Sequence, residues 1–338
     1  MRVTSQFSLA LSPSLSFRGP MDKKLETVSR DELWRELDQH GYVVIKNVVS
    51  PNTCADIHTA FWDYMGHMNP MINRHDAATW TTDNWPVNTR GLLQHYNVGL
   101  QRHAILSRMA CKPVFEKLYG TDQLWTSFDG TSFTKRPKVF RYQSVQDWNN
   151  KAWERENVHV DQTTEGLKSV QGGLAVVDQE EDGHVFLCVP GSHRYHAEIM
   201  ALNGGFKPGD WLVMNEACKA LLKEKGLQMT RVPMKAGDFV LWDSRTAHAS
   251  AGYCKTVAAT TTRLQVFVCM RPIKPETREV EMKKRQRAYK DGRVSKHNAE
   301  CIALFGKKPR LYKPAVVEFN VPASAEMSED EMRVHGLI

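Results

Sequence analysis

The sequence predicts a mainly β protein: a double-stranded β-helix core of the jelly-roll or cupin type, with flanking helices. From about residue 138 to residue 270, short β-branched and aromatic runs alternate with turn signals, and eight such runs match the strand number of this fold. Before them, several segments between residues 29 and 118 have helical periodicity. After them comes a segment rich in lysine and arginine.

The length and composition of the chain are sufficient for a full hydrophobic core. The chain has 338 residues, 41% hydrophobic and 25% charged, which fits one large domain with additions or two modest domains. No run approaches the roughly 20 consecutive apolar residues that a membrane-spanning helix requires, so we expect no membrane span. The seven cysteines are scattered without a C-x-x-C pair, which argues against a zinc ribbon or a disulfide framework. A reducing compartment is therefore expected.

The domain organisation predicted from these patterns has three parts. Residues 1–20 contain basic residues and serines but no acid, which indicates an organellar transit peptide or a disordered tail. Residues 21–275 form the β-helix domain with its N-terminal helical part. Residues 276–338 are a basic extension packed on the same domain. We expect a cytoplasmic protein, or an organellar one if residues 1–20 are a targeting peptide.

The first helix and strand have clear boundary signals. Ser29 and Glu32 have the spacing of a capping box, and apolar residues follow at helical spacing, so a helix is expected over residues 29–40. Gly41 ends it. Residues 42–50 are β-branched and predict a strand, which Ser-Pro closes.

Two further helices enclose a long loop. Residues 52–68 and 103–118 have helical period. Residues 69–89 have none, and long loops in compact domains are often functional lids. Within this loop, Trp80 and Trp85 are expected to pack against the domain rather than form a substrate wall.

The β-helix itself is predicted from eight segments separated by turn residues. An insertion over residues 194–227, partly helical, interrupts them. The predicted strands are residues 138–143, 157–162, 170–178, 184–189, 227–234, 238–243, 246–250 and 263–270.

A candidate metal site begins in the second of these strands. Residues i and i+2 share a face of a strand, so His159 and Asp161 project together while Val158 and Val160 project the other way. If the valines pack outward, an imidazole and a carboxylate enter the interior, where they need a partner such as a cation. The best third ligand is His248, on a strand that jelly-roll pairing can return beside the first pair.

This ligand set suggests a particular metal and a cosubstrate. Two histidines and one carboxylate, with further positions open, suit non-haem Fe(II) enzymes, although a zinc enzyme with the same ligands stays open. Arg263 lies on the last strand and would project inward with Gln265 and Phe267. A buried guanidinium is costly without an anionic partner, and its fork matches a carboxylate.

With these motifs, the chain resembles the phytanoyl-CoA dioxygenase-like family of Fe(II)/2-oxoglutarate-dependent oxygenases. The resemblance rests on the order of HVD, QGG, DGHVFLCVPGSH and GDFVLWDSRTAHAS, followed by an arginine that leads a strand, and it covers roughly residues 30–270. It implies that His159, Asp161 and His248 bind iron and that Arg263 pairs with the distal carboxylate of 2-oxoglutarate. Ser250 matches a position that often assists there.

One departure from the family pattern concerns this arginine. The gap between the second histidine and Arg263 is longer than in many relatives, with residues 252–262 inserted as a loop. Arg245 and Arg271 are therefore the fallback positions for the anchor.

The resemblance implies a reaction as well as a site. Fe(II), 2-oxoglutarate and O2 would together hydroxylate a C–H bond, with release of succinate and carbon dioxide, and the expected substrate is a small organic molecule or an acyl thioester. A first alternative is a cupin-type metalloenzyme that uses the same three ligands without 2-oxoglutarate. A second is a nucleic-acid-modifying oxygenase, or a silent binding module.

The second alternative depends on the distribution of charge. Residues 271–313 hold 14 lysines and arginines against 5 acids, whereas the rest of the chain is slightly acidic. Within them, residues 278–293 predict a surface helix that ends at Gly292. A solvated helical face is the preferred interpretation of this segment, and a patch for an anionic partner is the alternative.

Other polar residues have mostly structural interpretations. Gln171 either points inward and touches the cosubstrate or bonds to a neighbouring strand. His193 and Asp238 are turn residues, and His297 is expected on the surface of the basic segment. One residue of a group ahead of the H-x-D strand is expected to line the cosubstrate pocket, namely Lys135, Lys138, Arg141 or Gln143.

Overall fold

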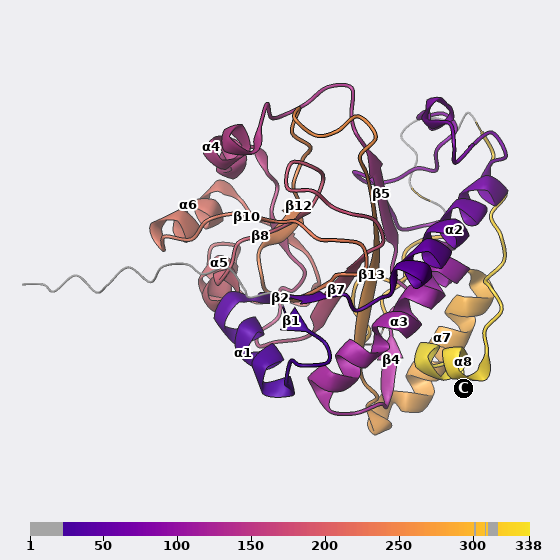
Figure 1. Cartoon of the computed structure of the whole chain (residues 1–338). Coiled ribbons are helices and arrows are strands. Elements are labelled where there is room, and N and C mark those ends of the chain that lie inside the picture. Colours follow the sequence, from indigo (N-terminus) through magenta and orange to yellow (C-terminus); the bar gives the residue numbers. More distant parts are fainter. Residues whose placement is uncertain (1–22, 301, 308, 310–316) are drawn as a thin grey trace, which may run out of the picture.

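The computed structural model describes residues 23–300, 302–307, 309 and 317–338, arranged around two β-sheets (Figure 1). The predicted tail, residues 1–20, lies outside the described residues. The larger sheet contains, in order, β1 (Lys23–Lys24), β2 (Tyr42–Lys46), β11 (Phe239–Asp243), β7 (Val170–Ala175), β13 (Thr262–Pro272), β5 (Thr131–Lys135) and β3 (Leu92–Leu93), while β4 (Leu124–Thr126) also pairs with β13. The smaller sheet contains, in order, β10 (Thr230–Val232), β8 (Phe186–Cys188), β12 (His248–Ser250), β6 (His159–Val160) and β9 (Leu212–Val213).

The path of the chain through these sheets is that of a double-stranded β-helix. From β5 to β8 the chain alternates between the larger and the smaller sheet, and from β10 to β13 it alternates again. All pairings among these eight strands are antiparallel. The predicted fold class is therefore confirmed.

One of the eight predicted strands is wrong. Residues 138–143 form no strand, and within them only Tyr142 makes an isolated bridge, to Cys254. The first strand of the β-helix is instead β5, which ends two residues before Pro137. A helix that was not predicted follows, and Ser144 is its N-cap. The Ser144 hydroxyl accepts a hydrogen bond from the Asp147 amide at 3.1 Å.

The helices pack against the outer faces of the sheets. They are α1 (Arg30–His40), α2 (Pro51–Met68), α3 (Arg102–Tyr119), α4 (Val145–Arg155), α5 (His196–Ala201), α6 (Glu216–Glu224), α7 (Arg278–Asp291) and α8 (Glu329–His335). Short 3-10 turns cover Ala77–Thr79, Val98–Leu100, Ser192–Tyr195 and Pro275–Thr277. In Figure 1, α2, α3, α7 and α8 lie on the side of the larger sheet, and α4 to α6 lie on the side of the smaller one.

The predicted boundaries of the first helix are confirmed. Ser29 and Glu32 form both hydrogen bonds of a capping box, and Gly41 ends α1 with a left-handed φ of 78°. Trp80 and Trp85 pack as predicted, since both contact the Phe133 ring.

Alternation along the strands separates the outer cores from the interior. Phe239 and Leu241 of β11 belong to the core shared with α1, α2 and α3, whereas Val240 and Trp242 face the space between the sheets. Val158 and Val160 pack outward against α4 and α5, as the sequence predicted. The neighbouring odd-numbered residues therefore face the interior.

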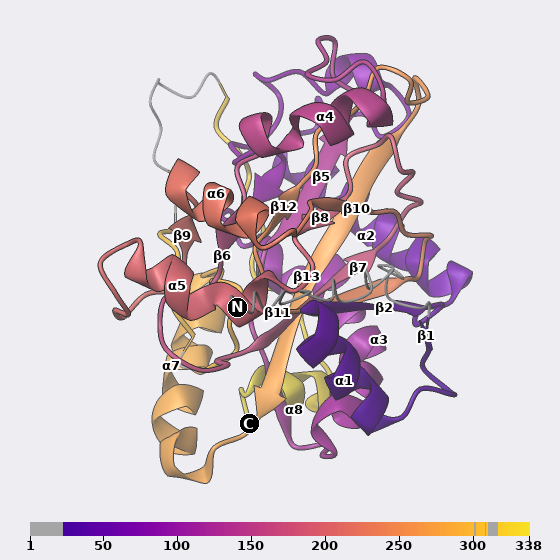
Figure 2. The same cartoon turned by 90° about the vertical axis from the view of Figure 1, so that its left-hand side faces the viewer.

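The C-terminal part of the chain covers the far end of the larger sheet. Arg285 of α7 is fully buried, and its guanidinium donates hydrogen bonds to the backbone oxygens of Thr126, Ala299 and His335. Figure 2 shows α7 and α8 near the lower end of β13. The domain boundaries drawn from the sequence stay a prediction.

Two expectations from composition can be compared with the described residues. Within them, no helix has both the length and the apolar character needed to cross a membrane. The six cysteines that the structure describes are buried free thiols.

Close packing at the centre of the larger sheet predicts that Gly172→Ala is destabilising. A Cβ there would lie 2.3 Å from the Phe239 ring and 2.9 Å from the Val268 carbonyl oxygen, so we expect a loss of about 1–3 kcal/mol from overpacking. Urea unfolding measures it. Gly66→Ala is the matched control, because Gly66 lies within α2 with open space around it; this change should add about 0.5–1 kcal/mol. Equal stability of the two variants would contradict the packing described here.

Candidate metal centre

The pairing of two short strands brings the two predicted histidines together. β6 and β12 are antiparallel neighbours, and His159 lies directly opposite His248. Residues paired in this way project from the same face, and the two ring centroids are 4.4 Å apart. Asp161 follows two residues after His159 and reaches the same point. β6 itself is shorter than the predicted strand of residues 157–162.

The three side chains offer their ligand atoms to a common centre. Asp161 Oδ1 is 3.5 Å from His159 Nε2, and Asp161 Oδ2 is 3.6 Å from His248 Nε2. One ligand atom from each residue lies within 4.8 Å of the others. The Nδ1–H of His248 donates to the Thr246 carbonyl at 2.9 Å, which leaves its Nε2 lone pair available. Two imidazoles and a carboxylate in this arrangement suit a divalent cation such as Fe(II).

The surroundings of His159 and Asp161 keep these two groups in the protonation states that bind metals. Burial lowers the pKa of His159 to about 4, and the nearby His248 acts in the same direction while Asp161 opposes it. Burial alone would raise the pKa of Asp161, but the imidazoles of His248 and His159 hold it below its ordinary value. At neutral pH the site therefore presents a neutral His159 and a charged carboxylate.

These residues line a cavity of about 600 Å3 between the two sheets. The volume is in the range of small-molecule sites. The predicted site residues all contribute to its wall: His159, Asp161, Gln171, His248, Ser250 and Arg263. Apolar walls come from Phe186, Trp242 and Phe267. The segment before α3, which includes β3, contributes Thr89, Arg90, Leu92 and Gln94.

Arg263 of β13 lines this cavity. Its side chain is buried, Nη1 donates to Ser132 Oγ at 2.8 Å, and Nη2 donates to Gln265 Oε1. Burial lowers the pKa of its guanidinium to about 10. Among the described residues, no carboxylate forms an ion pair with it. A buried cation with neutral neighbours alone is suited to binding a carboxylate from outside the chain.

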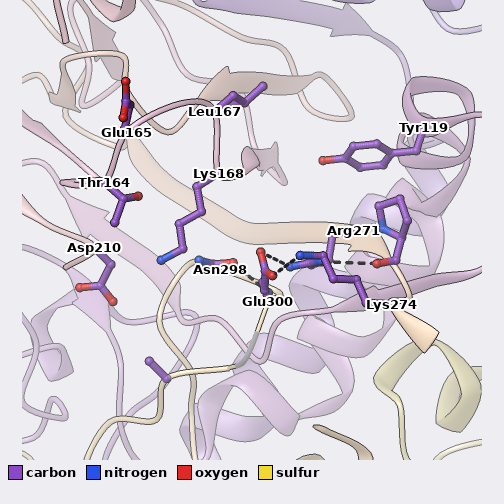
Figure 3. Close-up of a pocket in the computed structure, with 12 residues that line it drawn as sticks. Tyr119, Thr164, Glu165, Leu167, Lys168, Asp210, Arg271, Lys274, Asn298 and Glu300 are labelled. Carbon is purple, nitrogen blue, oxygen red and sulfur yellow. Dashed lines mark hydrogen bonds and ion pairs between the residues drawn. The ribbon is translucent and has the colours of Figure 1, made fainter. Parts of the chain in front are cut away.

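The two fallback arginines have acidic partners already. Arg245 Nη2 lies 2.6 Å from Asp243 Oδ2, and neither residue lines the cavity. Arg271 contacts Glu300 in a second cavity of about 660 Å3 (Figure 3). Of the three candidates, Arg263 is the one that lines the cavity of the predicted metal ligands.

The second cavity adjoins the first, since Asp210 and Asn298 line both of them. In Figure 3, Lys168 extends toward Asn298, and Lys274 lies beside Glu300, with Lys274 Nζ 2.6 Å from Glu300 Oε1. The basic residues around this cavity are thus partly neutralised within the chain.

The predicted surface position of His297 is wrong, because His297 lines the metal cavity. Its Nδ1 donates to Asp129 Oδ2 at 2.5 Å, and its ring lies 5.2 Å from the Trp242 ring and 5.3 Å from the Phe267 ring. Residues 295–298 all line the metal cavity. Neither motif nor periodicity in this segment signals such a position.

Other polar residues have the roles expected of them or different ones. His193 Nε2 lies 2.8 Å from the Asp38 carbonyl oxygen, and Asp238 accepts a hydrogen bond from the Asn47 amide, so both are structural as predicted. The expectation of a pocket residue at Lys135, Lys138, Arg141 or Gln143 is not met, because none of them lines the cavity among the described residues. Ser132 of β5 occupies that wall instead.

Comparisons with known proteins identify the family of this chain. The family model of phytanoyl-CoA dioxygenase (PhyH) matches residues 37–253, more than half of the chain. A curated relative, "Ava biosynthesis cluster protein O" of Aspergillus versicolor, is 27% identical over 253 residues, which are 72% of this chain and 77% of the relative.

Solved structures with a similar fold are more distant. The non-heme alpha ketoglutarate dependent carbocyclase SnoK from nogalamycin biosynthesis is 17% identical, with a TM-score of 0.46 over 75% of this chain and 87% of that one. EctD from S. alaskensis, crystallised with 2-oxoglutarate and 5-hydroxyectoine, is 15% identical, with a TM-score of 0.47 over 86% of each chain.

The family match covers β6 and β12 and includes His159, Asp161 and His248. As its motifs predicted, the chain belongs to the phytanoyl-CoA dioxygenase (PhyH) family of non-haem Fe(II)/2-oxoglutarate-dependent oxygenases.

Proposed function

We propose that the protein hydroxylates a small organic molecule or acyl thioester, with Fe(II) held by His159, Asp161 and His248 and with 2-oxoglutarate anchored by Arg263. The observation that carries this proposal is the placement of all four residues in one cavity: three converging ligands and a buried guanidinium without an acidic partner among the described residues. A bound cation would complete the three converging ligands, and a dicarboxylate would pair with the buried guanidinium.

The protein's own residues bind and orient the reactants. A metal held by these three side chains would have further positions open to the cosubstrate. Ser250, two residues after His248 on β12, faces the same cavity and would assist in holding the cosubstrate. Once bound, Fe(II) and 2-oxoglutarate supply, with O2, the oxidant that inserts one oxygen atom into a C–H bond, while succinate takes the other and carbon dioxide leaves. Phe186, Trp242 and Phe267 exclude water from this space.

The two alternatives from the sequence have less support. A metalloenzyme that does not use 2-oxoglutarate gives no role to a buried Arg263. A nucleic-acid-modifying enzyme would use free cations in residues 271–313, but Arg285 is buried and several others contact acids in the described part of the chain: Arg271 and Lys274 contact Glu300, Lys283 contacts Glu279, and Lys296 contacts Asp210.

The reaction is tested by succinate formation. With Fe(II), 2-oxoglutarate and O2 supplied, we expect one group of compounds in a panel of small acids, amines, alcohols and acyl thioesters to raise succinate release well above the substrate-free rate. Mass spectrometry of the same mixtures should show a product heavier by one oxygen atom. Products formed at equal rates without 2-oxoglutarate would support the cupin-type alternative instead.

The metal ligands are tested by direct binding. We predict that His159→Ala and Asp161→Ala each abolish stoichiometric Fe(II) binding in anaerobic titrations, because each removes one of only three protein ligands. Circular dichroism should show an unchanged fold. His75→Ala, which removes an exposed histidine far from the triad in sequence, is the control and should bind one equivalent. Tight binding by both ligand variants would mean that the triad is wrongly assigned.

The cosubstrate anchor is tested by a change that keeps its charge. Lysine lacks the planar fork of arginine, so Arg263→Lys should raise the KM for 2-oxoglutarate roughly 10- to 150-fold, the equivalent of a charge-assisted hydrogen bond. Inhibition by N-oxalylglycine, which resembles the cosubstrate, should weaken by a similar factor while Fe(II) stays bound. Arg245→Lys and Arg271→Lys are the matched controls and should change neither value. A normal KM in Arg263→Lys would remove Arg263 from the proposal.

A further inference from the structure

Residues 295–297, which lie outside the family match, are connected to the predicted metal ligand Asp161 by the side-chain amide of Gln171. Gln171 Nε2 donates one hydrogen bond to Asp161 Oδ2, at 3.0 Å, and another to the backbone oxygen of His297, at 2.7 Å. We propose that Gln171 and residues 295–297 form a support that positions the Asp161 carboxylate and belongs functionally to the metal centre. This inference rests on the proposed function, because it takes Asp161 to be an iron ligand.

The orientation of the Gln171 amide follows from its neighbours. A carboxylate and a backbone carbonyl can only accept hydrogen bonds, so the NH2 group must face both of them, and its two hydrogens are then used. Its Oε1 is buried and has no partner among the described residues. Gln171 lies on β7 in the centre of the larger sheet, between β11 and β13. A residue held on both sides by strands is a fixed point from which to orient a ligand.

Hydrogen bonds also hold residues 295–297, the other part of the support, in place. Asp129 Oδ2 accepts hydrogen bonds from His297 Nδ1 and from Ser127 Oγ, both at 2.5 Å. The amide of Ser295 donates to the Phe128 carbonyl at 2.9 Å, and the amide of Phe128 donates to Ser295 Oγ at 2.8 Å. Hydrogen bonds to residues 127–129 therefore fix the segment that holds the His297 carbonyl beside Gln171.

The support acts on the one charged ligand of the triad. Asp161 Oδ2 is held by Gln171 and lies beside His248, while Oδ1 lies toward His159. Without the amide, the carboxylate could rotate away from the two imidazoles. Hydrogen bonds to a metal ligand commonly change metal affinity 10- to 100-fold. The family match ends at residue 253, so a part of the chain outside the matched region contributes to this affinity.

The test measures Fe(II) affinity of the full chain without 2-oxoglutarate or substrate. Gln171→Leu keeps a side chain of similar size and removes the donor, so we expect its Fe(II) dissociation constant to rise roughly 10- to 100-fold. His297→Leu removes the bond to Asp129 and should weaken binding in the same direction. In His297→Asn, the side-chain amide places an N–H close to the position of Nδ1, and affinity should return to within about threefold of wild type, a difference below 1 kcal/mol.

A matched control separates positioning from general stability. His193 is also buried and hydrogen-bonded, but it lies outside the metal cavity, so His193→Leu should lower the melting temperature and leave the Fe(II) affinity unchanged. If Gln171→Leu and His297→Leu behave like this control, with a lower melting temperature and normal affinity, the inference is overturned. If wild type itself binds no Fe(II), the proposed function fails first, and this inference fails with it.

Discussion

The pairing of β6 with β12 is the constraint on which the rest of the site depends. These strands are two and three residues long, yet their register sets His159 opposite His248. A shift of β6 by one residue would turn Val160 toward the cavity and His159 away from it, so the two imidazoles would no longer be in contact. The outward packing of Val158 and Val160 against the helices opposes such a shift, so the hydrophobic core and the ligand geometry specify the same register.

Charge balance is a second constraint on this cavity. A buried carboxylate and a buried guanidinium are each costly when they lie apart, and the structure does not pair Asp161 with Arg263. In the proposed complex, the charges of Fe(II), Asp161, dianionic 2-oxoglutarate and Arg263 would cancel. These four groups would then carry no net charge together, which fits the apolar wall of Phe186, Trp242 and Phe267.

Much of this could be predicted from the sequence because its determinants are local. The spacing of His159 and Asp161, the capping box at Ser29 and the apolar run of the strand at residues 238–243 each lie within a few residues. Residues 138–143 were misread because they are β-branched and aromatic, whereas the following Ser144 starts a helix. His297 could not be found in this way. Its position depends on contacts with Asp129 and Gln171, which are more than a hundred residues away, and its own neighbours have no periodic pattern.

The central claim is that one iron and one 2-oxoglutarate bind together at this cavity. An anaerobic titration followed by visible absorption tests it directly, because 2-oxoglutarate chelated to Fe(II) gives a charge-transfer band that neither component gives alone. We expect the band to reach its maximum at one equivalent of each and to be missing in Asp161→Ala. A protein that binds Fe(II) tightly but develops no band with saturating 2-oxoglutarate would contradict the account.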